Sequence, residues 1–91
     1  MTDIPKTLEE RGESYGNYFE QTKIIADFRR VLNKVLQDKR IFLETDQEDA
    51  LLMIIVKISR ILNGNPDHID NWADIAGYAT LVASRLEKDT L

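Results

Sequence analysis

Seven consecutive apolar residues, Ala50 to Val56, constrain the fold of this chain more than any other feature. They belong to a longer helical pattern that we expect to span residues 46–62, and they cover every face of that helix. A helix that is apolar all round is buried on several sides at once, so other elements must surround it. In a chain of 91 residues a second subunit is a further source of that cover, and we expect a homo-oligomer.

Helical periodicity extends along the whole chain and predicts an all-α fold in a single domain, residues 1–91. A short helix should begin near Pro5, and three main helices follow it. The turn through Asn63-Gly64-Asn65-Pro66 is short, so the last two helices should form an antiparallel hairpin. The expected bounds of the main helices are 17–39, 46–62 and, starting at 67 or 70, up to 87.

Polar residues mark where these helices begin. Asn17, with Glu20 three residues later, should cap the first main helix, and Thr45 with Glu48 has the spacing of a capping box for the second. The link over residues 40–44 is apolar enough to fold back onto the core.

The last helix carries an apolar stripe that we expect to face inward, and Trp72 should lie in the core rather than serve as a stacking platform. Its small residues should allow a neighbouring helix to approach closely, and the tail 88–91 should fray. The stripe consists of Trp72, Ile75, Ala76, Ala79, Val82, Ala83 and Leu86, and the small residues are Ala73, Ala76, Gly77 and Ala79.

Charge and composition exclude several classes of function. The net charge is −4, and residues 46–91 carry four basic and eight acidic side chains, so the chain lacks the basic face of a nucleic-acid-binding protein. Without cysteine it has neither disulfides nor a thiolate metal site. No apolar run reaches the ~20 residues that span a bilayer, and the N-terminus does not resemble a signal peptide. We therefore expect a cytoplasmic protein that binds neither nucleic acid nor membrane.

The hairpin turn brings basic and acidic residues to the same end of two helices. In an antiparallel hairpin the numbers of facing residues have a nearly constant sum, here about 131. Lys57 is then level with Asp74. The other expected pairs are Arg60 with Asp70 or Asn71, and Met53 with Tyr78.

This charged seam has two interpretations. The simpler one is a set of interhelical salt bridges that fix the register, with Asp67 or Asp70 capping the last helix. The other is a site for an anionic ligand or nucleotide, in which Lys57 and Arg60 contact phosphate. The segment from Glu10 to Gly16 could then close over it as a lid. The candidate ligand-binding residues are Arg11, Tyr15, Lys57, Arg60, Asp70, Asp74 and Tyr78.

The sequence assigns no catalytic and no metal-ligating residue. Asp46, Glu48 and Asp49 lie at the far end of their helix. About 20 Å of helical rise separates them from the acidic residues near the hairpin turn, Asp70 and Asp74, so the two groups cannot meet within one subunit. His68, the single histidine, follows Pro66 in the turn and should be a solvated loop residue.

Two motifs resemble those of a known family. The first is Glu10-Arg11-Gly12 followed by Tyr15-Gly16. The second reads Lys57, Arg60-Ile61-Leu62-Asn63-Gly64, Asp70, Trp72, Asp74-Ile75-Ala76-Gly77-Tyr78-Ala79 and Leu81. Over nearly its whole length the chain resembles a small family of phage and prophage proteins of unknown function. The resemblance implies an accessory protein in the cytoplasm of a bacterial host.

A weaker similarity extends to the nucleotide-modification-associated domains of phage and, weaker still, to MazG-type all-α nucleotide pyrophosphatases. In MazG-type enzymes, acidic motifs on adjacent helices bind magnesium and the triphosphate. Here Asn71 stands three residues before Asp74, where a glutamate would be expected, and Lys57 and Arg60 replace the second acidic pair.

The leading hypothesis is therefore that the chain binds a nucleotide or a phosphorylated metabolite without a cofactor. One alternative is a helical module that engages a host or phage protein. The other is a MazG-like hydrolase, the only one of the three that would need magnesium.

Overall fold

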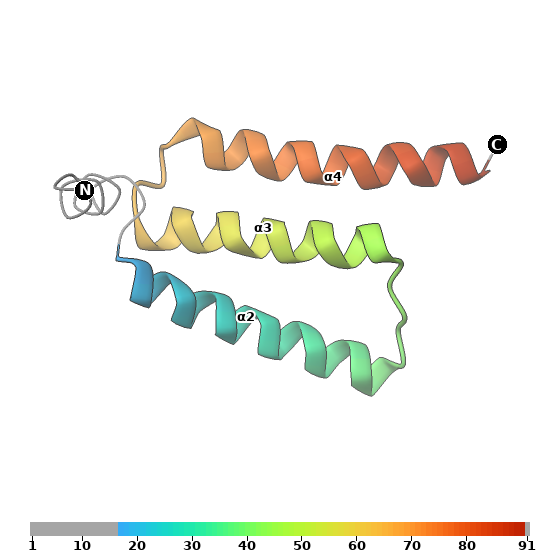
Figure 1. The fold of residues 1–91 in the computed structure, drawn as a ribbon, viewed down its shortest axis with the longest axis horizontal. Helices are drawn as coiled ribbons and strands as arrows, with labels where there is room; N and C mark the ends of the chain where they lie inside the picture. The colour runs from blue at the N-terminus through green and yellow to red at the C-terminus, as the bar shows by residue number, and fades with distance from the viewer. Residues whose placement is uncertain (1–16, 91) are drawn as a thin grey trace, which may run out of the picture.

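The computed structural model describes residues 17–90, which form three long helices and the links between them (Figure 1). α2 spans Tyr18–Lys39, α3 spans Thr45–Asn63 and α4 spans Ile69–Thr90. Residues 17–90 contain no strand, so the fold is all-α, as predicted. The short helix expected near Pro5 lies outside the described residues.

α2 begins and ends with well-formed caps. The Asn17 side-chain oxygen accepts hydrogen bonds from the backbone N–H groups of Phe19 (2.8 Å) and Glu20 (3.3 Å), which confirms the predicted N-cap. At the other end Arg40 adopts a left-handed conformation with φ of 54°. The Ile41 N–H then donates to the Leu36 carbonyl at 2.9 Å, which closes a Schellman-type turn.

α3 begins one residue earlier than predicted. Glu44 is the N-cap, and its N–H donates to the side-chain oxygen of Gln47 at 2.9 Å, which completes a capping box. The expected capping box of Thr45 and Glu48 is therefore wrong, because Thr45 is already the first helical residue. The spacing of Glu44 and Gln47 is equally good for a capping box, and only the backbone decides between the two.

The turn between α3 and α4 is stabilised by its own polar groups. Asn65 accepts a hydrogen bond from the N–H of Asp67 through its side chain (2.9 Å), and the Trp72 indole N–H donates to the Pro66 carbonyl (2.8 Å). α4 then continues to Thr90, so the predicted fraying is wrong for residues 88–90. The Thr90 hydroxyl, which donates to the Glu87 carbonyl, helps to hold this last turn.

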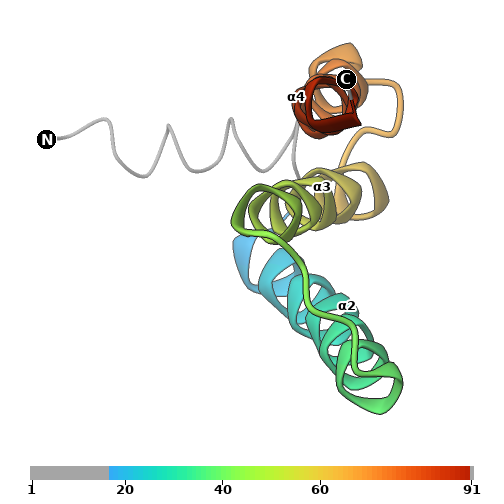
Figure 2. The ribbon, with the colours of Figure 1, turned by 90° about the vertical axis from the view of Figure 1, so that its right-hand side faces the viewer.

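α3 lies between α2 and α4 and makes the main helix–helix contacts with both. Figures 1 and 2 show the three helices as one bent layer rather than a closed bundle. Because only two sides of α3 are covered by helices, Ala50 and Ile55 are the only buried apolar residues in residues 17–90. The link between α2 and α3 does not fold onto this core as expected, since Phe42 is 94% exposed.

The inward face of α4 differs from the predicted one by roughly a quarter of a turn. Trp72 is 55% exposed, and the small residues expected to meet a neighbouring helix lie at the surface. The stripe that faces α3 keeps the predicted Ile75 and Val82 but adds polar and aromatic residues, of which Arg85 pairs with Asp46 on α3. This stripe consists of Asn71, Ile75, Tyr78, Val82 and Arg85.

Candidate functional site

Lys57 and Asp74 form the salt bridge that the hairpin register predicts. Nζ of Lys57 lies 2.8 Å from Oδ2 of Asp74. The lysine side chain is only 11% exposed, whereas the aspartate side chain is 49% exposed. The Lys57 ammonium group therefore lies inside the α3–α4 seam. The Asp74 carboxylate lies at the edge of the seam, where it can also contact a second group.

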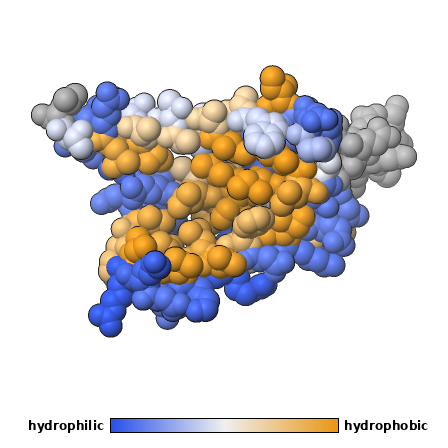
Figure 3. All heavy atoms as spheres, turned by 180° about the vertical axis from the view of Figure 1, so that it is seen from behind, coloured by the Kyte–Doolittle hydropathy of each residue, from blue (hydrophilic) through white to orange (hydrophobic). Residues whose placement is uncertain are grey.

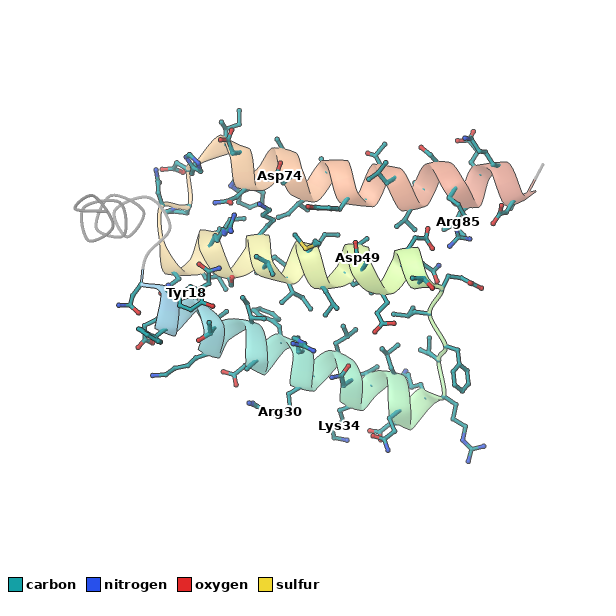
Figure 4. The ribbon with its side chains drawn as sticks, viewed as in Figure 1. Tyr18, Arg30, Lys34, Asp49, Asp74 and Arg85 are labelled. Carbon is teal, nitrogen blue, oxygen red and sulfur yellow. The ribbon has the colours of Figure 1, made fainter. Side chains whose placement is uncertain are left out.

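A second salt bridge at the opposite end of the hairpin follows the same register. Arg85 donates to both carboxylate oxygens of Asp46, at 2.6 and 2.9 Å, and to Asp89 at 3.0 Å. The hydrogen bonds from Arg85 hold the pKa of the Asp46 carboxyl below its usual range, and those to Asp46 and Asp89 raise the pKa of the guanidinium. Figure 4 shows Asp74 in the first half of α4 and Arg85 near its end, both next to α3.

The remaining predicted residues of the seam differ in their exposure. Asp70 is largely exposed, and its Oδ2 lies 3.6 Å from Nε2 of His68, which is partly buried rather than solvated as expected. Asn71 is 1% exposed, and its side-chain nitrogen has no partner among the described residues. Arg60, half-buried one turn after Lys57, comes level with Asn71 in this register.

A shallow hollow of roughly 340 Å³ opens beside the salt bridge, on the surface of α4. Two of the predicted ligand-binding residues, Asp74 and Tyr78, lie on its wall. The hollow is lined by Ala73, Asp74, Gly77, Tyr78 and Leu81. The seam and the hollow thus share the carboxylate of Asp74.

Gly77 forms part of the hollow, although no packing contact within residues 17–90 requires a glycine there. A Cβ placed on it would have no heavy atom within 4 Å. Glycine in a helix interior costs about 1 kcal/mol relative to alanine. Gly77 therefore lowers the stability of α4 at an exposed position of the helix.

The structure does not test every predicted site residue. Arg11 and Tyr15 lie outside the described residues, so the predicted lid is not placed. Across residues 17–90, no three His, Asp or Glu side chains are grouped so that they could hold a metal ion. None of the three described helices is long and apolar enough to cross a bilayer.

Sequence reasoning missed the pair of Asp46 and Arg85 and the exposure of Gly77. The pair could have been predicted, because its residue numbers have the same sum, 131, as those of Lys57 and Asp74. The glycine was grouped with its small neighbours, and only the structure shows that no helix packs against it.

Comparison with known protein families assigns the chain to one family. A family model described as a domain of unknown function, DUF6378, matches residues 5–86, which is most of the chain. The chain belongs to the DUF6378 family. No curated protein and no solved structure matches it significantly. The DUF6378 match includes Lys57, Asp74 and Gly77, so the seam and the hollow both lie within the family domain.

Proposed function

We propose that this DUF6378 protein binds a small nucleotide-like molecule at the hollow beside the Lys57–Asp74 salt bridge, as a phage or prophage accessory protein. The observation that carries this proposal is Gly77, an exposed glycine in the middle of a helix that no internal contact explains. A ligand that approaches the backbone closely would explain it, because any larger side chain would project into the hollow.

The residues around Gly77 fit the ribose and base of a nucleotide better than its phosphates. Asp74 is anchored by Lys57 at 2.8 Å and remains half-exposed, so it can accept a hydrogen bond from a sugar hydroxyl. Tyr78 offers an aromatic ring with a hydroxyl group. The candidates for phosphate recognition are Arg60, one turn after Lys57 on α3, and Arg11, which lies outside the described residues.

Ligand binding is tested by a thermal melt against a panel of nucleosides and nucleotides, with and without magnesium. A ligand at about 100 times its Kd should add about 2.7 kcal/mol to the free energy of unfolding. Tyr78→Ala should abolish the shift for the ligand that binds. Asp27→Asn, an exposed substitution on α2 far from the hollow, is the matched control and should keep the full shift.

Gly77→Ala separates a ligand site from a merely structural glycine. Without ligand the variant should be more stable by about 1 kcal/mol, since alanine is the better helix former. In a titration it should bind the ligand at least tenfold more weakly than the wild type. A variant that is both more stable and equally able to bind would show that the glycine serves no ligand.

A second candidate function is that of a helical interaction module, which engages a host or phage protein. The observation that favours it is an exposed apolar surface across the three helices, seen from behind in Figure 3. We call it the apolar face. Its most exposed residues are Phe28, Val31 and Val35 of α2, Leu51 of α3, and Trp72 and Leu86 of α4.

This second function predicts a different response to mutation. Lys57→Ala and Arg60→Ala should lower the stability of the protein while capture of its partner protein survives.

A further inference from the structure

The apolar face is too large and too continuous for a surface in permanent contact with water. Val31 is 63% exposed and Trp72 is 55% exposed, while only Ala50 and Ile55 are buried among the apolar residues of 17–90. Figure 3 shows the apolar side chains joined into one surface over the middle of the layer. Contiguous apolar patches of more than a few hundred Å² mark interaction sites.

Helix geometry explains why this surface lies on one side of the layer. On α3, Lys57 is directed to α4, and Ile55, about 160° away around the helix, is buried on the side of α2. Leu51, Ile54 and Ile58 lie between these two directions, about 60–120° from Lys57. They therefore face neither neighbouring helix, and the stripes on α2 and α4 extend the same surface.

We propose that a second copy of this chain covers the apolar face, so that two three-helix layers pack face to face around a two-fold axis. This inference goes beyond the proposed ligand site and does not depend on it. The six exposed residues of the face offer on the order of 500 Å², and the half-buried residues beside them bring this close to the ~800 Å² per partner of a standard interface.

A second copy would stabilise the fold of this chain more reliably than a partner protein that binds only at times. With two buried apolar residues in residues 17–90 and no cysteine in the chain, the single layer has little else to stabilise it. A second copy is always present at equal concentration, so it can provide the missing half of a core. The face itself carries no charge that an identical face would oppose.

The charges of the outer helices select the orientation. α2 carries five basic and three acidic residues, whereas α4 carries two basic and four acidic residues. Figure 4 shows Arg30 and Lys34 on the outer side of α2, at the rim of the layer. A two-fold axis parallel to the helices places α2 of each copy opposite α4 of the other, so that opposite net charges meet. An axis across the helices would instead place α2 against α2.

The first test is the mass of the full chain in solution, measured by light scattering during size exclusion. We expect twice the 10.5 kDa of one chain. Val31→Glu, which puts a charge on the α2 part of the face, should give a monomer. Leu81→Glu is the matched control, because Leu81 is similarly exposed (69%) but lies on the other side of α4, and this variant should remain a dimer. A monomeric wild type, or a dimer that survives Val31→Glu, would overturn the proposal.

Cross-linking tests the orientation without disturbing the fold. Because the chain has no cysteine, Val35→Cys and Leu86→Cys each introduce a single reactive group at a half-exposed position of the face. The two variants, carrying tags of different size, are mixed, allowed to exchange subunits and treated with a short bismaleimide. We expect the mixed product to exceed both like pairs. A majority of like pairs would overturn the pairing of α2 with α4.

Discussion

The Lys57–Asp74 salt bridge should respond unequally to the loss of its two partners. Asp74→Ala leaves an ammonium in a site where the lysine side chain is 11% exposed, while Lys57→Met leaves a carboxylate that is already 49% exposed and can be hydrated. The asymmetry follows from burial alone, because both substitutions remove the same ionic contact.

The magnitudes follow from the same numbers. Removing one partner of a fully buried ion pair costs 3–5 kcal/mol, and the slight exposure of Lys57 places Asp74→Ala at the lower end, about 3 kcal/mol. In Lys57→Met the methionine keeps most of the apolar packing of the lysine stem, so this variant should lose about 1 kcal/mol or less. The double variant should resemble Lys57→Met, which gives a coupling energy of about 2–3 kcal/mol.

Urea unfolding of the four proteins, followed by circular dichroism at one fixed protein concentration, measures this cycle. The fixed concentration matters because association contributes to apparent stability. Equal losses in the two single variants would contradict the asymmetry argued from burial. A double variant that loses the sum of both would show that Lys57 and Asp74 do not form this contact in solution.

Three further predictions concern the ends of the helices. Because Arg85 lowers the pKa of Asp46, the stabilisation from this carboxylate should be complete at neutral pH and should disappear as the pH falls through the lowered pKa. The difference in unfolding free energy between the wild type and Asp46→Asn should therefore shrink in an acid titration. A difference that stays constant would refute the role of the charge. Asn17→Ala, which removes the N-cap of α2, should cost about 1 kcal/mol in urea unfolding, and no loss would contradict the cap. Arg40→Gly should stabilise the protein by about 0.5–1 kcal/mol in the same assay, because glycine adopts a φ of 54° without strain, whereas a loss of stability would show that the arginine side chain contributes a contact.

The helices and their register were predictable because they depend on local rules. Asn17 has a side chain that can cap a helix, and the Asn-Gly-Asn-Pro turn is short enough to force α3 and α4 into an antiparallel pair. Once the pair is antiparallel, the helical repeat alone brings Lys57 opposite Asp74. The start of α3 was misplaced by one residue because Glu44 and Thr45 both begin a capping-box pattern.

The orientation of α4 was not predictable from its apolar pattern. Trp72 and its stripe look like a core, but only α3 lies beside α4 in residues 17–90, and α3 meets it with Lys57 and Asp46. These polar contacts set the orientation of α4 about its own axis, so that Asn71 is buried and Trp72 is half-exposed. A sequence pattern identifies apolar stripes, and it does not say whether a stripe is covered within the chain or by another chain.

The ligand site is tested most directly by ¹⁵N–¹H correlation spectra of the full chain, recorded while the nucleotide that gives the largest thermal shift is added. Our account predicts that the largest amide shifts cluster in the segment 73–81 of α4 and around Lys57, with the middle of α2 unchanged. Saturating shifts that avoid this segment, or no shifts with any nucleotide of the panel, would contradict it.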